Sequence, residues 1–243
     1  AFSPDRSTLY YFDQSDNKVY SRTFDAGTLG PEVEVFTAGI KMNASGTFSI
    51  SGDGKRLVFN SDQNSANTGL EIWDIETATL VAGNTLSRAS SGCNSDASRV
   101  LALGFTGDFD IYLYDDSLTQ LDVYAGSFDT LAVLDDQYFA ASDDLNTIRF
   151  FDYSGDAITL VDSASNSPSQ PPNWGANSGF GVGLVNGVWY CYTNRGGIFS
   201  FDGTTAAFVD GEDIGIANGT MRSCAGVGNR AIAADTSTGS DEF

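Results

Sequence analysis

One feature of this chain limits its fold more than any other: an aromatic residue followed by Asp recurs at the end of short apolar segments. Five such pairs follow one another at comparable intervals, Phe24-Asp25, Trp73-Asp74, Tyr114-Asp115, Phe151-Asp152 and Phe201-Asp202. Successive Asp residues of these pairs are 49, 41, 37 and 50 positions apart. A period of this length is typical of chains in which one supersecondary unit repeats and packs on its neighbours.

A second mark, a tight polar turn, precedes each pair at a similar distance. These turns are Ser3–Arg6, Ser51–Gly54, Asn94–Ala97, Leu134–Gln137 and Val185–Gly187, and a sixth, Gly226–Asn229, has no pair after it. Short apolar segments surround the two marks, and some alternate with a period of two, as in Ile111–Tyr114. Alternation of this kind predicts strands. In the second unit the expected strands are 47–50, 56–60, 70–74 and 79–82.

Units of four short strands with this spacing are typical of propeller blades, which bury their faces against one another. A β-sandwich would not place the same turn and the same pair at the same phase five times. We therefore predict an all-β chain, a β-propeller of four-stranded blades. About six blades are visible, and six or seven are expected in the complete ring. The predicted single domain, 1–243, has blades at 1–38, 39–86, 87–126, 127–167, 168–211 and, incomplete, 212–243. Because the two ends do not add up to one blade, either the sixth blade is rudimentary or the chain is an excerpt of a longer one, and we expect the excerpt.

The composition agrees with this fold and excludes several functions. Of the 32 acidic residues 26 are Asp, and Lys occurs three times, so turn formers are abundant and helix-surface residues are scarce. The net charge of −20 disfavours nucleic acids and anionic membranes as partners. No His is present, which rules out a Ser-His-Asp triad and His-ligated metals. No apolar run reaches the length of a membrane-spanning helix.

The three cysteines, Cys93, Cys191 and Cys224, match no zinc-binding spacing. We interpret them as small buried apolar residues. Two alternatives stay open at this point, a bridge between Cys191 and Cys224 and a reactive thiol.

Two stretches resemble known blades. Phe2–Asp5, Thr8–Tyr11, Asp16–Tyr20 and Phe24-Asp25 together are similar to a blade of the gluconolactonase or YVTN-lactonase type. Ser51–Phe59 followed by Glu71–Asp74 resembles a TolB-type, WD-repeat-like blade. The likeness covers two blades well and three loosely. Its motifs are structural turns that propellers of unrelated function share, so the resemblance implies a fold and not an activity.

Gluconolactonase-type enzymes hold a divalent metal at the propeller channel with Glu, Asn and Asp side chains. No residue of this chain matches those ligands one by one, so the resemblance assigns no catalytic residue and leaves any metal ligands unknown. Acidic clusters recur at 13–17, 108–110, 115–116, 143–144 and 210–213, without EF-hand spacing. We interpret them as solvated turn carboxylates and expect no cofactor, with Ca²⁺ as the alternative.

The long loops indicate where partners would bind. In a propeller the B–C and D–A loops lie on one face, and loops 60–69 and 163–179 fall on that face. Loops lengthen where function is added. Trp174 lies in a Ser-, Asn- and Pro-rich loop, and Trp is favoured in recognition surfaces. The candidate partner-binding residues are Trp174, Asn173, Asn177, Asn64 and Asn67. The alternative is that Trp174 plugs the channel mouth or anchors its own loop.

Two glycosylation triplets begin at Asn43 and Asn218, at the same phase of their blades. The sequence as a whole favours a non-catalytic binding or structural module on an extracellular, cell-envelope or virion surface. Its expected partner is a protein or a glycan, without nucleic-acid binding or membrane insertion. The first alternative is a metal-dependent hydrolase or lactonase of the gluconolactonase type, and the second is a periplasmic TolB-like protein-binding domain. The oligomeric state is left open.

Overall fold

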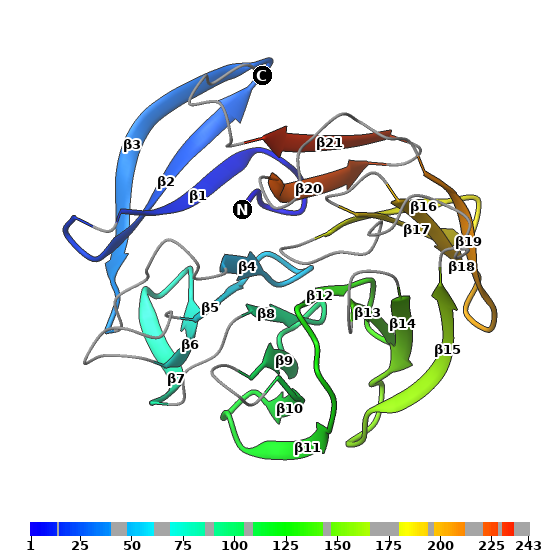
Figure 1. Ribbon diagram of the computed structural model, residues 1–243. Coiled ribbons are helices and arrows are strands. Elements are labelled where there is room, and N and C mark those ends of the chain that lie inside the picture. The colour runs from blue at the N-terminus through cyan, green and yellow to red at the C-terminus, as the bar shows by residue number, and fades with distance from the viewer. Residues whose placement is uncertain are drawn as a thin grey trace. The chain divides into compact units, whose positions relative to one another are not determined.

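In the computed structural model, most of the described residues lie in short strands (Figure 1). The described residues are 1–13, 15–39, 48–60, 69–85, 90–104, 109–142, 147–165, 180–193, 197–211, 221–227 and 230–235. Every regular element in these residues is a strand, which confirms the all-β prediction. Within the same residues there is no helix that could cross a membrane.

The strands form six antiparallel sheets, which we number in chain order. The first sheet contains β1 (Thr8–Asp13), β2 (Lys18–Asp25) and β3 (Thr28–Thr37). The second contains β4 (Phe48–Ile50), β5 (Arg56–Asn60), β6 (Leu70–Asp74) and β7 (Thr79–Asn84). The third contains β8 (Ser90–Cys93), β9 (Arg99–Leu103), β10 (Ile111–Asp115) and β11 (Gln120–Tyr124).

The fourth sheet contains β12 (Thr130–Val133), β13 (Tyr138–Ser142), β14 (Thr147–Asp152) and β15 (Thr159–Ser165). The fifth contains β16 (Phe180–Val185), β17 (Val188–Thr193), β18 (Gly197–Phe201) and β19 (Ala206–Gly211), and the sixth contains β20 (Met221–Val227) and β21 (Arg230–Asp235). In every sheet, strands that follow each other in sequence are hydrogen-bonded neighbours. β5 and β6 have the bounds that the sequence predicts.

The aromatic residues of the recurring pairs occupy one equivalent position in four sheets. Each ends the third strand and faces the start of the second strand: Trp73 pairs with Leu57, Tyr114 with Val100, Phe151 with Phe139 and Phe201 with Trp189. All four aromatic side chains are buried. The predicted equivalence of these four residues is therefore confirmed.

The pair Phe24-Asp25 does not follow this pattern, which corrects the prediction of five pairs in phase. Thr8 pairs with Thr23 and Leu9 with Arg22, so Arg22 and Thr23 stand where the other sheets carry the aromatic residue and Asp. The reason is the tight hairpin between β2 and β3. Ala26 and Gly27 both have positive φ, and this two-residue turn lets β2 continue to Asp25.

The recurring Asp residues close the turns between third and fourth strands. Asp115 Oδ1 accepts hydrogen bonds from the Ser117 amide at 3.0 Å, the Ser117 hydroxyl at 2.7 Å and the Thr119 amide at 2.8 Å. Asp202 Oδ1 accepts in the same way from the amide and hydroxyl of Thr204 and from the amide of Thr205. These side chains replace backbone partners that the turn lacks.

The tight turns that precede β5 and β9 pack on one another. The amide of Asp53 donates to the carbonyl of Ser95 at 2.7 Å, which joins the turns of the second and third sheets. A Cβ added at Gly52 would lie 3.0 Å from the Ser95 Cα. This close backbone approach explains the glycine in that turn.

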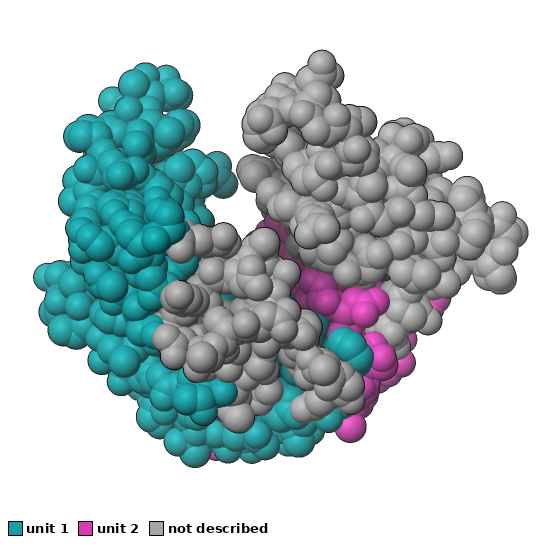
Figure 2. Space-filling model, turned by 60° about the vertical axis from the view of Figure 1, so that its left-hand side comes forward, with its two compact units in different colours: residues 1–124 teal, residues 125–243 magenta. Residues whose placement is uncertain are grey.

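Contacts along the chain divide it into two compact units, residues 1–124 and 125–243 (Figure 2). In unit 1 one cluster lies between the first and second sheets and another between the second and third. The first cluster contains Val19, Phe36, Leu57, Phe59 and Trp73, and the second contains Val58, Leu70, Ile72, Val100 and Tyr114. In unit 2 the fourth and fifth sheets meet through Ile148, Phe150, Cys191, Phe199 and Phe201. The interior is thus built from sheet-on-sheet packing.

Candidate functional site

The loop residues that the sequence singles out lie outside the described part of the chain. This holds for the partner-binding candidates Asn64, Asn67, Asn173, Trp174 and Asn177 and for the glycosylation candidates Asn43 and Asn218. It also holds for most of loops 60–69 and 163–179. The candidate site is therefore built below from described residues.

The described acidic clusters act as turn ligands. Asp13 Oδ1 accepts from the Ser15 amide at 2.8 Å, and Asp16 accepts from the Lys18 amide at 3.2 Å and from the Tyr20 hydroxyl. Asp108, Asp143, Asp144, Glu212 and Asp213 lie outside the described residues. Within the described ranges, no three His, Cys, Asp or Glu side chains gather closely enough to share a metal ion.

Cys93 and Cys191 are free and buried, as the interpretation of them as small apolar residues requires. Burial raises the pKa of the Cys93 thiol to about 12 and also raises that of Cys191. Both thiols are therefore protonated at neutral pH, and the thiol form is a poor nucleophile. The side chain of Cys224 lies outside the described residues.

The most unusual surface in the described residues is one side of the first sheet. The strand register places Tyr11 opposite Tyr20 and Leu9 opposite Arg22, and β3 adds Glu34 beside Tyr20 and Glu32 beside Arg22. The opposite side of this sheet packs on the second sheet. We call the unusual side the Tyr11–Tyr20 face, and it consists of Leu9, Tyr11, Lys18, Tyr20, Arg22, Glu32 and Glu34.

Hydrogen bonds and ion pairs connect the side chains of this face. The Tyr11 hydroxyl donates to Glu32, Arg22 Nε donates to the Tyr11 oxygen at 3.3 Å, and Arg22 Nη2 lies 3.1 Å from Glu32 Oε2. Lys18 Nζ lies 2.6 Å from Glu34 Oε2. The rings of Tyr11 and Tyr20 are stacked, with centroids 5.9 Å apart and planes 26° apart. These contacts hold the face in a defined arrangement while it is exposed.

These contacts also fix the protonation states. The hydrogen bonds from Tyr11 and Arg22 hold the pKa of Glu32 below its ordinary value. The hydrogen bond to Glu32 raises the pKa of Tyr11, and the one to Asp16 raises that of Tyr20. At neutral pH the Glu32 carboxylate is therefore charged and the phenols of Tyr11 and Tyr20 are protonated.

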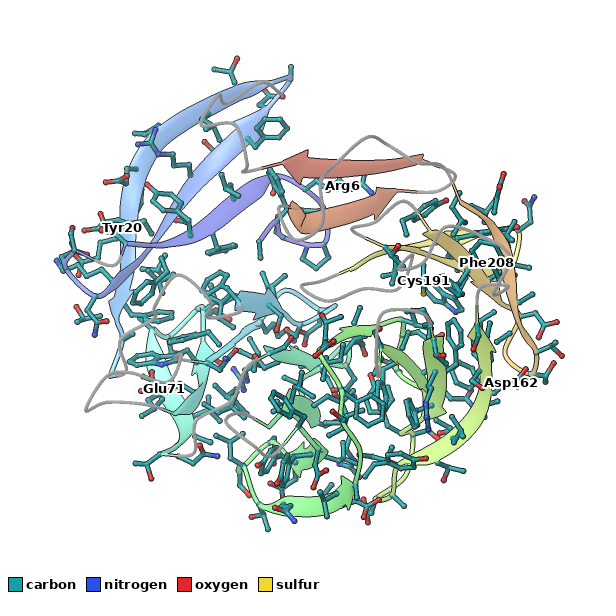
Figure 3. The ribbon with its side chains drawn as sticks, in the orientation of Figure 1. Arg6, Tyr20, Glu71, Asp162, Cys191 and Phe208 are labelled. Atoms are coloured by element: carbon teal, nitrogen blue, oxygen red, sulfur yellow. The ribbon has the colours of Figure 1, made fainter. Side chains whose placement is uncertain are left out.

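The same positions in the second sheet form an interior instead. Tyr11, Tyr20 and Arg22 correspond by register to Phe59, Glu71 and Trp73 (Tyr20 and Glu71 are labelled in Figure 3). The Trp73 indole donates to the buried Glu71 carboxylate at 2.6 Å, and the Gly39 amide donates to the same oxygen at 3.3 Å. Phe36 of the first sheet stacks on Trp73, with centroids 4.2 Å and planes 4° apart. The three-stranded first sheet places a cation where the four-stranded sheets bury Trp73, Tyr114, Phe151 and Phe201.

Sequence reasoning missed this face, although a signal for it was present. Asp16 and Asn17 are turn formers between two segments rich in aromatic and apolar residues, which is a signal for a hairpin. Counting outward from that turn places Arg22, and not Phe24, opposite Leu9 and so at the position of the buried aromatic residues.

Comparisons with known proteins identify the fold of this chain but no family to which it belongs. No family model matches the sequence, and no curated protein matches it. Among solved structures, the C-terminal WD40 domain of Sif2 is similar, with a TM-score of 0.63 and 14% identity over 96% of this chain and 64% of that one. The WD40 repeats of RRP9 give a TM-score of 0.54 and 10% identity over 86% of this chain and 60% of theirs.

A third similar structure is KlAtg21 in a complex with the coiled coil of AgAtg16, with a TM-score of 0.56 and 10% identity over 86% of this chain and 68% of that one. The fold defined by the repeated sheets and these likenesses is the β-propeller. The solved propellers that it resembles are of the WD-repeat type. The chain spans 64% of the length of the Sif2 domain and 60% of that of the RRP9 repeats.

Proposed function

We propose that this chain is a non-catalytic propeller module that binds a protein or glycan partner on an extracellular, cell-envelope or virion surface. The observation that carries the proposal is the use of its acidic residues. The recurring Asp side chains accept hydrogen bonds within turns and so hold the scaffold together. Hydrogen bonds from Ser3 and Ser7 lower the pKa of Asp5, and those from Thr205 and Thr204 lower that of Asp202. Both carboxylates therefore stay ionised as turn ligands.

Two further facts support a binding role. The solved structures that the chain resembles are WD40 propellers, and one of them is described as a complex with a coiled coil. The strong negative charge suits a protein that must stay soluble while exposed to salt water. Loops 60–69 and 163–179, with Trp174 in the second, are the surface that we assign to the main partner.

The binding role can be tested by selection followed by substitution. Immobilised full chain is screened against a displayed peptide library and a glycan array, and the affinity of each selected ligand is measured for Trp174→Ala. Phe109→Ala serves as the matched control, because Phe109 is an exposed aromatic side chain outside loops 60–69 and 163–179. We expect Trp174→Ala to weaken the ligand about tenfold or more and Phe109→Ala to change it less than about twofold. Equal losses of affinity in the two variants would show that Trp174 is not part of the binding surface.

The catalytic alternative is tested with lactones and aryl esters in the presence of calcium, zinc or manganese, with a chelated sample as control. Metal-dependent turnover that chelation abolishes would show that the chain is a hydrolase and would overturn the proposal of a non-catalytic module. The proposed setting is tested by expression through a secretory pathway. A mobility shift on glycosidase treatment that disappears in Asn43→Gln and Asn218→Gln would show that the two triplets are used.

A further inference from the structure

We propose that the Tyr11–Tyr20 face is a second interaction surface, and that its ligand is a cationic protein segment rich in arginine. This surface is separate from loops 60–69 and 163–179, and the inference does not depend on Trp174.

The first step is the position of the face in the repeat. In the second sheet the corresponding residues Leu57, Phe59 and Trp73 pack against the preceding sheet. In the fifth sheet Cys191, Phe199 and Phe201 do the same. In both cases another sheet of the same chain covers the face. The first sheet has this geometry but offers Tyr, Arg and Glu in place of large apolar residues.

The second step is the chemistry of those residues. Tyr and Arg are enriched in interfaces between separately folded partners, where they provide much of the binding energy. Here Tyr11 and Arg22 both bond to one oxygen of Glu32, Oε2, and Arg22 also bonds to Tyr11. The face is therefore stable in water without a ligand. Its side chains are also held in place before binding, which lowers the entropy cost of association.

The third step is the sign of the charge. Glu32 and Glu34 are the most exposed charged side chains of the face, at 43% and 47%, whereas Lys18 and Arg22 are 30% and 36% exposed. Asp16 adds a carboxylate next to Tyr20. The outermost charges are thus negative, on a chain whose net charge is −20. A potential of this sign attracts cationic segments and accelerates their association.

The fourth step distinguishes arginine from lysine. A guanidinium group forms two parallel hydrogen bonds with a carboxylate and also stacks on aromatic rings. The face offers both kinds of contact together, since the stacked Tyr11 and Tyr20 rings lie beside Glu32 and Glu34. Cation–π contacts with Tyr add to the preference. The geometry therefore favours arginine over lysine at equal charge.

The probe is a capped ten-residue peptide that alternates Arg and Thr, with a Lys/Thr peptide of the same length beside it. Binding to the full chain is measured by calorimetry at about 0.15 M salt, where long-range attraction is screened. The test variant is Glu32→Gln with Glu34→Gln. The matched control is Glu76→Gln with Asp116→Asn, which removes the same charge from exposed positions elsewhere in unit 1.

We expect the Arg peptide to bind more tightly than the Lys peptide. We expect the test variant to weaken the Arg peptide about tenfold and the control less than about threefold. Tyr20→Phe should retain the ring contact and most of the affinity, whereas Tyr20→Ala should not. All variants should keep the parent unfolding midpoint, because the side chains that they alter lie at the surface.

Equal losses in the test and control variants would show attraction by bulk charge only and would overturn the proposal. Equal affinity for the two peptides would overturn the preference for arginine, and with it the proposal. A dimer in sedimentation experiments that Glu32→Gln with Glu34→Gln dissolves would assign the face to a second copy of the chain instead. None of these results alters the outcome of the Trp174 experiment.

Discussion

The first and fourth sheets use one backbone position in opposite ways. In the first sheet Arg22 occupies this position. Its side chain lies at the surface and forms an ion pair with Glu32. Phe151 occupies the same position in the fourth sheet, where it is buried, stacked on Phe139 at 4.8 Å and edge-on to Phe128 at 5.9 Å. The backbone pairing is alike in the two sheets. The same backbone position thus carries a surface ion pair in one sheet and a buried ring in the other.

Removal of the two side chains gives the largest expected contrast. Phe151→Ala deletes a fully buried ring and should reduce the free energy of unfolding by about 3–5 kcal/mol. Arg22→Ala removes an exposed ion pair and should cost less than about 1 kcal/mol. Urea unfolding of both variants, followed by fluorescence and circular dichroism, measures the difference. A comparable loss in both would show that the Arg22 position is also buried, and that the Tyr11–Tyr20 face is no surface.

A smaller contrast separates Trp73 from Tyr20, each of which donates a hydrogen bond to a carboxylate. Trp73→Phe retains an aromatic ring against Phe36 but removes the indole donor from the buried Glu71, and we expect a cost of about 1–3 kcal/mol. Tyr20→Phe removes a donor from the exposed Asp16 and should change stability by less than about 0.5 kcal/mol.

The hydrogen-bond origin of the Trp73 effect is checked by a double-mutant cycle with Glu71→Gln. Coupling between the two sites is expected, because each partner contributes only when the other is present. Additive effects would mean that Trp73 acts through ring packing alone.

Most of the fold was predictable because its signals are local. Tight turns and alternating segments fixed β5 and β6 to the residue, and they placed Trp73, Tyr114, Phe151 and Phe201 in equivalent positions. Each of these signals depends on residues within one hairpin. No long-range information was needed to find the repeat.

The candidate site was not predictable in the same way, because it depends on the register between strands. Phe24-Asp25 imitates the recurring pair, and it conceals the fact that Arg22 pairs with Leu9. A displacement of two residues keeps each side chain on its side of the sheet but moves it along the strand, so alternation alone does not reveal the error. The ion pairs of Arg22 and Lys18 with Glu32 and Glu34 appear only when β3 is placed beside β2.

The pH dependence of stability gives a third, smaller contrast at the same point of the repeat. In the fifth sheet Asp202 directly follows the third strand, at the position where the first sheet carries Thr23. Hydrogen bonds from Thr205 and Thr204 lower the pKa of Asp202. A lowered pKa means that the ionised carboxylate stabilises the folded state above the ordinary Asp pKa of about 3.9, and that this contribution disappears as the pH falls through the folded-state pKa.

The test compares the parent chain with Asp202→Asn at constant ionic strength between about pH 7 and pH 2. The parent should be the more stable protein above about pH 4, and the difference should shrink at lower pH. Thr23→Val in the first sheet is the control and should show a pH-independent difference. A constant gap between parent and Asp202→Asn would mean that the turn depends on the shape of the side chain and not on its charge.

The smallest expected effect concerns the backbone of the tight turns that precede β1 and β5. Arg6 and Gly54 occupy the same turn position, with φ of 60° and 75°, and their amides donate to Ser3 and Ser51. This left-handed conformation is unfavourable for any residue with a Cβ. Arg6→Gly should therefore stabilise the chain by about 0.5–1 kcal/mol, and Gly54→Ala should destabilise it by a similar or larger amount.

Arg6→Ala separates backbone strain from the charge of the arginine, because it removes the charge but keeps the Cβ. Unfolding midpoints should then leave Arg6→Ala near the parent and Arg6→Gly above it. A gain in Arg6→Ala equal to that in Arg6→Gly would assign the effect to the arginine side chain, and the two turns would then differ in charge and not in backbone strain.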